Sequence, residues 1–170
     1  MSKSDRSKSD RSKSDRSSNH PSNHDGRPTD DAAAAKTQAL FEALAAAARA
    51  VRVHAHAPYS KFQVGAAVLD EQGRIHAGCN VENAAYPQGW CAETSALAAL
   101  VSAGGKKVLA VVVCGVAAEP VTPCGGCRQK LREFAADDCP VWIVDPHSLR
   151  ASFTLGELLP CSFGPLHLRS

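Results

Sequence analysis

Apolar residues recur at helical spacing where the patterned part of the chain begins. Leu40 and Leu44 are four positions apart and are followed by alanines one turn later, in the run AAAAKTQALFEALAAAARAVRVHA over residues 32–55. This spacing predicts an amphipathic helix. One of the two aspartates just before the run is suited to cap the N-terminus, and Pro58 is expected to end the helix.

Shorter runs after this helix predict strands. FQVGAAVLD (62–70) and RIHAGCNV (74–81) are β-prone and flank the turn EQG, so they predict a hairpin. VLAVVVCGV (108–116) is a continuous apolar run of the kind found in a strand covered on both faces. CPVWIVD (139–145) predicts another buried strand.

Two further helices are predicted among these strands. One runs from about Cys91 to Ala103, and the other covers PCGGCRQKLREFA, residues 123–135, with Pro123 near its start. The order is then helix, two strands, helix, strand, helix, strand. Such an order places a sheet between helices, which predicts an α/β domain of three layers.

The composition changes sharply near residue 32. Residues 2–16 are SKSDR repeated three times, and the SSNHPSNHDGRPTDD that follows contains no large apolar side chain, so residues 1–31 are predicted to be a disordered tail. This tail carries seven Lys and Arg against six Asp and Glu, a mixed charge that is unsuited to gripping nucleic acid. The repeat is compatible with an address, a regulatory segment or an accident of the gene.

Length, charge and cysteine content restrict the remaining classes of protein. The chain has 170 residues of which 44% are hydrophobic, which suits one globular domain over residues 32–170, and no apolar run is long enough to span a membrane. The domain is nearly neutral and lacks the one-sided positive charge of nucleic-acid-binding proteins. The N-terminus shows no secretory signal pattern, so the expected compartment is the reducing cytoplasm. Seven cysteines then indicate free thiols, metal binding or catalysis.

Three cysteines stand at predicted helix starts. Cys124 and Cys127 form P-C-G-G-C, a spacing that lets two sulfurs of one helical turn converge on one ion and that redox pairs also use. Cys91 begins the other helix, so helices entered from the same end of the sheet would bring the three thiols together. Three cysteines with one open position make a catalytic zinc site. Glu93 then lies beside the ion, where a water-activating acid or base is needed.

These motifs closely resemble the small homotetrameric cytidine deaminases. The resemblance runs from about Tyr59 to Pro165, through YSKFQVGAAV, GCNVENAAYPQGWCAE, TPCGGCRQ and ELLPCSFGP. The paired C-A-E and P-C-x-x-C elements are a thiol variant of the zinc-deaminase signature. The resemblance implies a three-layer α/β/α sandwich with a mixed sheet of about five strands.

The resemblance also implies a role for each site residue. Zn²⁺ is held by Cys91, Cys124 and Cys127, and Glu93 moves protons. The implied substrate contacts are Asn80 and Glu82 for the ribose, Phe62 against the pyrimidine, Ala92, and Phe163 lent to the site of a neighbouring subunit. Asn80 and Glu82 are two positions apart on a predicted strand, which puts them on one face, although a polar strand end would show the same pattern.

The implied activity is the hydrolytic deamination of cytidine and deoxycytidine to uridine, deoxyuridine and ammonia, as in pyrimidine salvage. Zinc would lower the pKa of its bound water so that hydroxide can add to C4. The implied partners are a nucleoside substrate and three further copies of the chain in a homotetramer with shared sites, with no nucleic acid or membrane. Two alternatives stay open: deamination of another aminopyrimidine such as blasticidin S, which the ribose motif N-V-E-N disfavours, and a non-catalytic zinc-stabilised paralogue.

Two positions depart from the family pattern. The family commonly reads C-A-E-R, but Thr94 follows Glu93 here. Without that arginine the excess negative charge of three thiolates is expected to raise the pKa of the bound water. Arg128 is one candidate substitute, and a plain surface arginine is the alternative. Trp90 replaces a more usual aliphatic residue and either packs under the loop or narrows the pocket.

Overall fold

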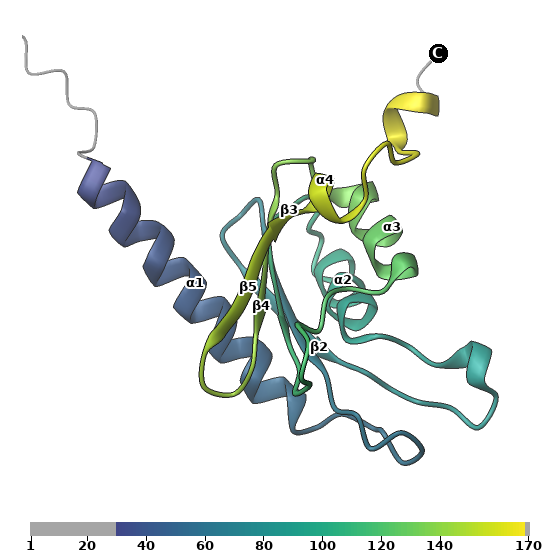
Figure 1. Ribbon diagram of the computed structural model, residues 1–170. Helices are drawn as coiled ribbons and strands as arrows, with labels where there is room; N and C mark the ends of the chain where they lie inside the picture. Colours follow the sequence, from purple (N-terminus) through teal and green to yellow (C-terminus); the bar gives the residue numbers. More distant parts are fainter. Residues whose placement is uncertain (1–29, 169–170) are drawn as a thin grey trace, which may run out of the picture.

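A computed structural model describes residues 30–168 of the protein (Figure 1). The elements are α1 (Asp30–Arg52), β1 (Gly65–Asp70), β2 (Ile75–Cys79), η1 (Tyr86–Gln88), α2 (Ala92–Ser102), β3 (Val108–Cys114), α3 (Gly125–Phe134), β4 (Pro140–Val144), β5 (Leu149–Thr154), α4 (Leu155–Leu158) and η2 (Pro165–Leu168).

The five strands form one mixed sheet in the order β2-β1-β3-β4-β5. β1 pairs antiparallel with both β2 and β3, β3 and β4 are parallel, and β5 returns antiparallel to β4. The predicted hairpin is therefore the pair β1–β2. The mixed sheet of five strands confirms the expected fold class.

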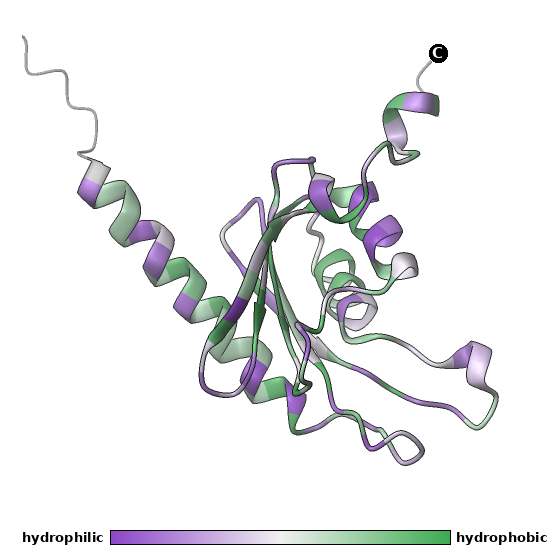
Figure 2. Ribbon diagram, in the orientation of Figure 1, coloured by the Kyte–Doolittle hydropathy of each residue, from purple (hydrophilic) through white to green (hydrophobic). Residues whose placement is uncertain are grey.

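Helices cover both faces of the sheet and make three layers (Figure 1). On one face Leu44 and Ala48 of α1 pack against the sheet. On the other face Leu97 and Leu100 of α2 and Leu131 of α3 form a second, larger core with the strands. Hydrophobic residues fill the sheet and α2, whereas α3 is largely hydrophilic (Figure 2). Because helices cover both faces of the sheet, residues on both sides of β1 and β3 are buried. This explains why β1 and most of β3 are continuous apolar runs.

Two glycines let the helices approach the sheet closely. A Cβ on Gly78 of β2 would overlap the backbone at Ser95 and Ala96 of α2. A Cβ on Gly65 of β1 would likewise overlap the Ala48 carbonyl of α1. Because these positions carry no side chain, α2 is held tightly against β2, and the position of its first turn is fixed relative to the sheet.

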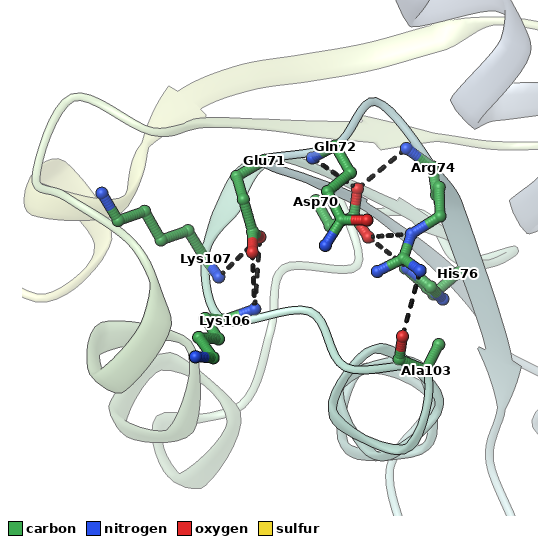
Figure 3. A network of polar contacts seen from close by, with 8 residues as sticks. All are labelled: Asp70, Glu71, Gln72, Arg74, His76, Ala103, Lys106 and Lys107. Atoms are coloured by element: carbon green, nitrogen blue, oxygen red, sulfur yellow. Dashed lines mark hydrogen bonds and ion pairs between the residues drawn. The ribbon is translucent and has the colours of Figure 1, made fainter.

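The turn of the β1–β2 hairpin is held by a buried carboxylate (Figure 3). Asp70 is fully buried and accepts hydrogen bonds from the backbone N–H groups of Gln72 and Arg74 at 2.9 and 2.8 Å. Arg74 Nε donates to the same carboxylate at 2.7 Å, and His76 Nε2 lies 2.9 Å from it. Burial raises the pKa of Asp70, but the hydrogen bonds from His76 and Arg74 outweigh that effect and hold the pKa well below its usual range.

The same turn is tied to the C-terminal end of α2 and to the segment before β3. Arg74 Nη1 donates to the Ala103 carbonyl at 3.0 Å. The Glu71 carboxylate accepts from the backbone N–H groups of Lys106 and Lys107 at 3.1 and 3.0 Å (Figure 3). This network fixes one end of α2, and the cysteine cluster described below lies at the other end.

Some elements begin or end at residues other than those predicted, and two elements were not predicted. α1 begins at Asp30, so the aspartates belong to the first turn and do not precede it, and the helix ends at Arg52, before Pro58. The predicted tail over residues 1–31 lies outside the described residues apart from its last two. β5 and α4 follow the last predicted strand and were assigned to no run of the sequence.

Within residues 30–168, no helix combines the length and the apolar character needed to cross a bilayer.

Candidate metal centre and substrate cavity

Three cysteines meet where two helices begin. Cys91 is the N-cap of α2, Cys124 is the N-cap of α3, and Cys127 lies in the first turn of α3. Their Sγ atoms all lie within 4.8 Å of one another, and those of Cys91 and Cys124 are 3.7 Å apart. The structure thus brings together the thiols that the sequence places at separate helix starts.

This cluster fits a tetrahedral zinc ion. Four ligands at the usual Zn–S distance place neighbouring sulfurs about 3.8 Å apart, close to the separation seen between Cys91 and Cys124. Both helices point their N-termini at the cluster, and the partial positive charge there favours thiolates. Cys127 is buried, whereas Cys91 and Cys124 line a cavity, so the open position of a three-thiolate site faces that cavity.

The thiols share protons unequally. Hydrogen bonds from Cys127 and Cys124 lower the pKa of Cys91 to about 6, because they stabilise its thiolate. The same hydrogen bond to Cys91, followed by burial and the nearby Glu93 carboxylate, raises the pKa of Cys127. A metal ion that takes all three sulfurs must therefore displace the shared protons, as is usual for thiolate sites.

Glu93 lies beside the cluster without closing it. Glu93 belongs to the first turn of α2 and is only 4% exposed. Its Oε2 accepts a hydrogen bond from Cys127 Sγ at 3.5 Å. Burial, and then the charge of Cys91, raise the pKa of its carboxyl group. A carboxyl group in this environment is suited to accept and return a proton.

A cavity of about 660 Å³ opens above Glu93 and the cysteines, a size that suits a nucleoside. Seven of the expected site residues line it: Phe62, Asn80, Glu82, Cys91, Ala92, Glu93 and Cys124. Ala92 is fully buried at the first position of α2, where it lines the cavity. Phe62 is 40% exposed, which leaves part of its ring free to meet a ligand.

Asn80 and Glu82 lie beyond β2, which ends at Cys79, so the prediction that they share one face of a strand is wrong; both nevertheless line the cavity and hold the segment that carries Phe62. Asn80 Oδ1 accepts from Val64 N–H at 2.8 Å, and its Nδ2 donates to the Phe62 carbonyl at 2.9 Å. Glu82 accepts from the backbone N–H of Tyr59 at 2.9 Å. Each side chain retains further hydrogen-bonding capacity, and both residues line the cavity.

Phe163 does not line this cavity. It lies on the segment between α4 and η2, is 58% exposed, and stacks on His167 with ring centroids 5.0 Å apart. Its carbonyl accepts from Gln129 Nε2 at 2.9 Å, which attaches the segment to α3. Within one chain, the structure therefore does not bring Phe163 to the other expected site residues.

Thr94 places a hydroxyl group next to the thiols. Its Oγ1 lies 3.7 Å from Cys127 Sγ. Arg128 points its guanidinium elsewhere, since it donates to the carbonyls of Pro123 and Leu158 at 2.7 and 2.8 Å. The hydroxyl of Thr94 therefore lies beside the thiols, whereas the Arg128 guanidinium is held by backbone carbonyls.

The cavity also contains residues to which the sequence analysis gave no role. Tyr59, Ser60 and Tyr86 line it, and the rings of Tyr59 and Tyr86 meet edge to face with centroids 6.1 Å apart. Tyr59 and Ser60 stand inside the quoted YSKF motif, which was the available signal. Trp90 also lines the cavity, and it is 51% exposed, so it lies at the rim of the pocket and is not packed under the loop.

The remaining cysteines lie outside the cluster. All seven cysteines of the chain fall in the described residues and none forms a disulfide. Cys114 and Cys139 are buried, Cys79 is half-buried and Cys161 is exposed. Cys114 and Cys139 thus pack as small apolar side chains, as free cysteines often do.

A Cys-x-Glu at one helix start and a Pro-Cys-x-x-Cys at another, meeting under a cavity on an α/β/α fold, define the class of zinc-dependent deaminases. The model of the cytidine and deoxycytidylate deaminase zinc-binding region matches residues 39–143. The cytidine deaminase of Sporosarcina psychrophila is 42% identical over 122 residues, which are 72% of this chain and 90% of that protein. The chain belongs to the cytidine deaminase family.

Solved structures agree with this assignment. The crystal structure of cytidine deaminase from Burkholderia pseudomallei matches with a TM-score of 0.68 at 40% identity, and covers 72% of this chain and 98% of that one. The enzyme from Mycobacterium tuberculosis matches with a TM-score of 0.62 at 40% identity, over 73% of this chain and 97% of that one. The expected family, fold class and zinc cofactor are confirmed.

Proposed function

We propose that this chain catalyses the hydrolytic deamination of cytidine and deoxycytidine to uridine, deoxyuridine and ammonia. One observation carries the proposal: Glu93 and two of the clustered cysteines line the same cavity as Asn80 and Glu82. The first group suits chemistry on the base, and the second suits recognition of a sugar. Relatives that carry the name cytidine deaminase at about 40% identity over most of their length support it.

The three cysteines and Glu93 have separate roles in the deamination. Cys91, Cys124 and Cys127 would hold a zinc ion, and that ion would supply the Lewis acid needed to activate a water molecule for addition to C4 of the pyrimidine. Glu93 accepts the proton that this water gives up and delivers it to N3. It then carries a second proton to the amino group, which leaves C4 as ammonia. One C–O bond forms and one C–N bond breaks, so the reaction needs no redox partner.

The cavity orients the substrate for this transfer. Asn80 and Glu82 take the ribose hydroxyl groups with the hydrogen-bonding capacity that the neighbouring segment leaves free. Phe62 packs on the pyrimidine ring, and the backbone at Ala92 meets the base edge. When the sugar and the base are both held, C4 is oriented towards the cysteine cluster and Glu93. This orientation lowers the barrier of the reaction.

An absorbance assay of the purified protein tests this proposal. Cytidine and deoxycytidine are expected to be deaminated and blasticidin S is not, in protein that contains about one zinc per chain by elemental analysis. Turnover of blasticidin S alone would point to another aminopyrimidine as substrate. Zinc-loaded protein inactive on all three compounds would identify a non-catalytic paralogue.

We also infer a homotetramer in which Phe163 completes the site of a neighbouring subunit. The exposed apolar side chains of the C-terminal segment support this inference, since Phe163, Leu166 and Leu168 are 58%, 66% and 76% exposed. Phe163 also stays away from the cavity of its own chain.

We infer the compartment of the protein from the state of its cysteines. Unpaired cysteines suit a reducing compartment, so we place the protein in the cytoplasm, where deamination of free nucleosides serves pyrimidine salvage. We also assign residues 1–31 to a segment outside the catalytic domain, since the family match begins at residue 39.

A further inference from the structure

The segment that carries Phe62 adopts a conformation that needs support. Residues 57–64, the part of the α1–β1 connection that leads into β1, contain no helix or strand and only a turn at residues 58–60. Lys61 has a φ of 59°, in the left-handed region that residues with a Cβ rarely adopt. Contacts from outside must therefore hold this segment in place.

Glu82 accepts three hydrogen bonds from this segment. Its Oε2 accepts from the backbone N–H groups of Tyr59 and Ser60 at 2.9 and 3.2 Å. Its Oε1 accepts a further hydrogen bond from the Ser60 hydroxyl. The Ser60 hydroxyl, more than any other group, holds the pKa of Glu82 below its usual range, and this keeps the side chain a charged acceptor.

Ser60 is the link between Glu82 and Phe62. Its Oγ donates to the Glu82 carboxylate and also accepts from Phe62 N–H at 3.0 Å. One hydroxyl group therefore sets both the orientation of the carboxylate and the backbone that carries the ring. Ser60 lines the cavity with both of them.

We propose that Ser60 is a positioning residue, whose hydroxyl orients the Glu82 carboxylate for the sugar hydroxyl groups of the substrate. The proposal rests on the proposed function, because it takes a nucleoside as the ligand. A carboxylate with three donors on one side has a fixed direction for the hydrogen bonds that it can still accept. Without the Ser60 hydroxyl, Oε1 loses its donor, and only the two backbone N–H groups at Oε2 still orient the carboxylate.

The test uses two competitive ligands that differ only in the sugar. Uridine and 2′,3′-dideoxyuridine carry the same base, but the second lacks both ring hydroxyl groups. For Ser60→Ala, the inhibition constant of uridine is expected to rise about tenfold, since a hydrogen bond to a charged group is disturbed. That of dideoxyuridine is expected to change less than about twofold. Ser60→Thr, which keeps the hydroxyl, is expected to restore uridine binding.

A matched control separates positioning from stability. Ser148 makes the same kind of contact, since its backbone N–H and its hydroxyl donate to the Asp145 carboxylate at 2.7 and 3.2 Å in the turn between β4 and β5. Ser148→Ala is expected to leave both inhibition constants unchanged. Zinc content and the midpoint of thermal unfolding are measured for every variant.

Two results would overturn the inference while leaving the proposed function intact. One is unchanged uridine binding in Ser60→Ala, and the other is an equal loss for both ligands, which would mean that Ser60 does not act on the sugar. A wild-type protein that fails to bind uridine would overturn the proposed function, and the inference with it.

Discussion

Each of the three clustered cysteines is an essential ligand if the site holds zinc with three protein groups. Cys91→Ala, Cys124→Ala and Cys127→Ala are each expected to lose zinc together with activity, since two remaining thiolates hold the ion poorly. Elemental analysis of the purified variants, beside the deaminase assay, measures both. The structure makes the prediction specific because these three sulfurs, from two helices, lie within 4.8 Å of one another.

The other cysteines provide the control for this experiment. Cys79→Ala, Cys114→Ala and Cys139→Ala remove thiols that lie outside the cluster, and they are expected to retain about one zinc per chain. A full complement of zinc in Cys91→Ala would show that the three-thiolate site is wrong.

Thr94 follows Glu93 directly and places its hydroxyl beside the cysteine cluster. Its hydroxyl lies 3.7 Å from Cys127 Sγ and can donate to the thiolate once zinc has displaced the proton. Thr94→Val has nearly the same shape but no donor, and it is expected to release zinc to a chelator roughly 10- to 100-fold faster. Thr94→Ser keeps the hydroxyl and serves as its control. Equal release rates for wild type and Thr94→Val would remove any role of the hydroxyl at the metal.

At the scale of elements, the hairpin that anchors the C-terminal end of α2 depends on Asp70. Its pKa is held below the unfolded value of about 3.9, so its ionised form stabilises the fold at neutral pH, and that stabilisation is lost as the pH falls below about 4. Asp70→Asn is expected to lower the midpoint of unfolding by urea at pH 7, and the difference from wild type is expected to shrink as the solution becomes acid.

The control is the same substitution at an exposed aspartate. Asp138→Asn changes a residue that lies open to solvent between α3 and β4, and it is expected to shift the midpoint little. A difference between wild type and Asp70→Asn that stayed constant, or grew, towards acid pH would contradict the lowered pKa.

The sequence predicted those elements whose pattern is determined by burial. β3 and β4 lie inside the sheet, and their apolar runs were sufficient to identify them. β5 is an edge strand in which Leu149 and Arg150 are exposed and only alternate residues pack against the core, so its short LRASFT run resembles a loop. α4 has four residues, too few for a helical period, although its capping box of Thr154 and Glu157 can be seen in hindsight.

In the candidate site, the sequence predicted the features that neighbouring residues encode and missed those that depend on the folded structure. The Cys-x-Glu and Cys-x-x-Cys spacings carry their chemistry within a few residues, so the sequence alone pointed to the cluster. The contact between Ser60 and Glu82 joins residues 22 positions apart through the folding of an irregular segment. No local pattern contains that information, and the same holds for the direction in which Arg128 points.

At the scale of the whole molecule, the C-terminal segment decides whether sites are shared between chains. Phe163→Ala chains mixed with Glu93→Gln chains are expected to show more activity than the sum of the two, because some mixed sites then contain both Glu93 and Phe163. Exchange of subunits is verified separately with labelled chains. Activity that stays additive although exchange is complete would show that each chain builds its own site.

The most direct test of the account is the turnover of cytidine by Glu93→Gln, measured on a sample whose zinc content is known. The glutamine keeps the shape of the side chain but cannot carry a proton, and general acid–base catalysis is worth roughly 10²- to 10⁴-fold in each step that uses it. The account predicts a loss of turnover of about 10³-fold or more with about one zinc per chain retained. Near-normal turnover would contradict it, and loss of the zinc would instead make Glu93 a ligand.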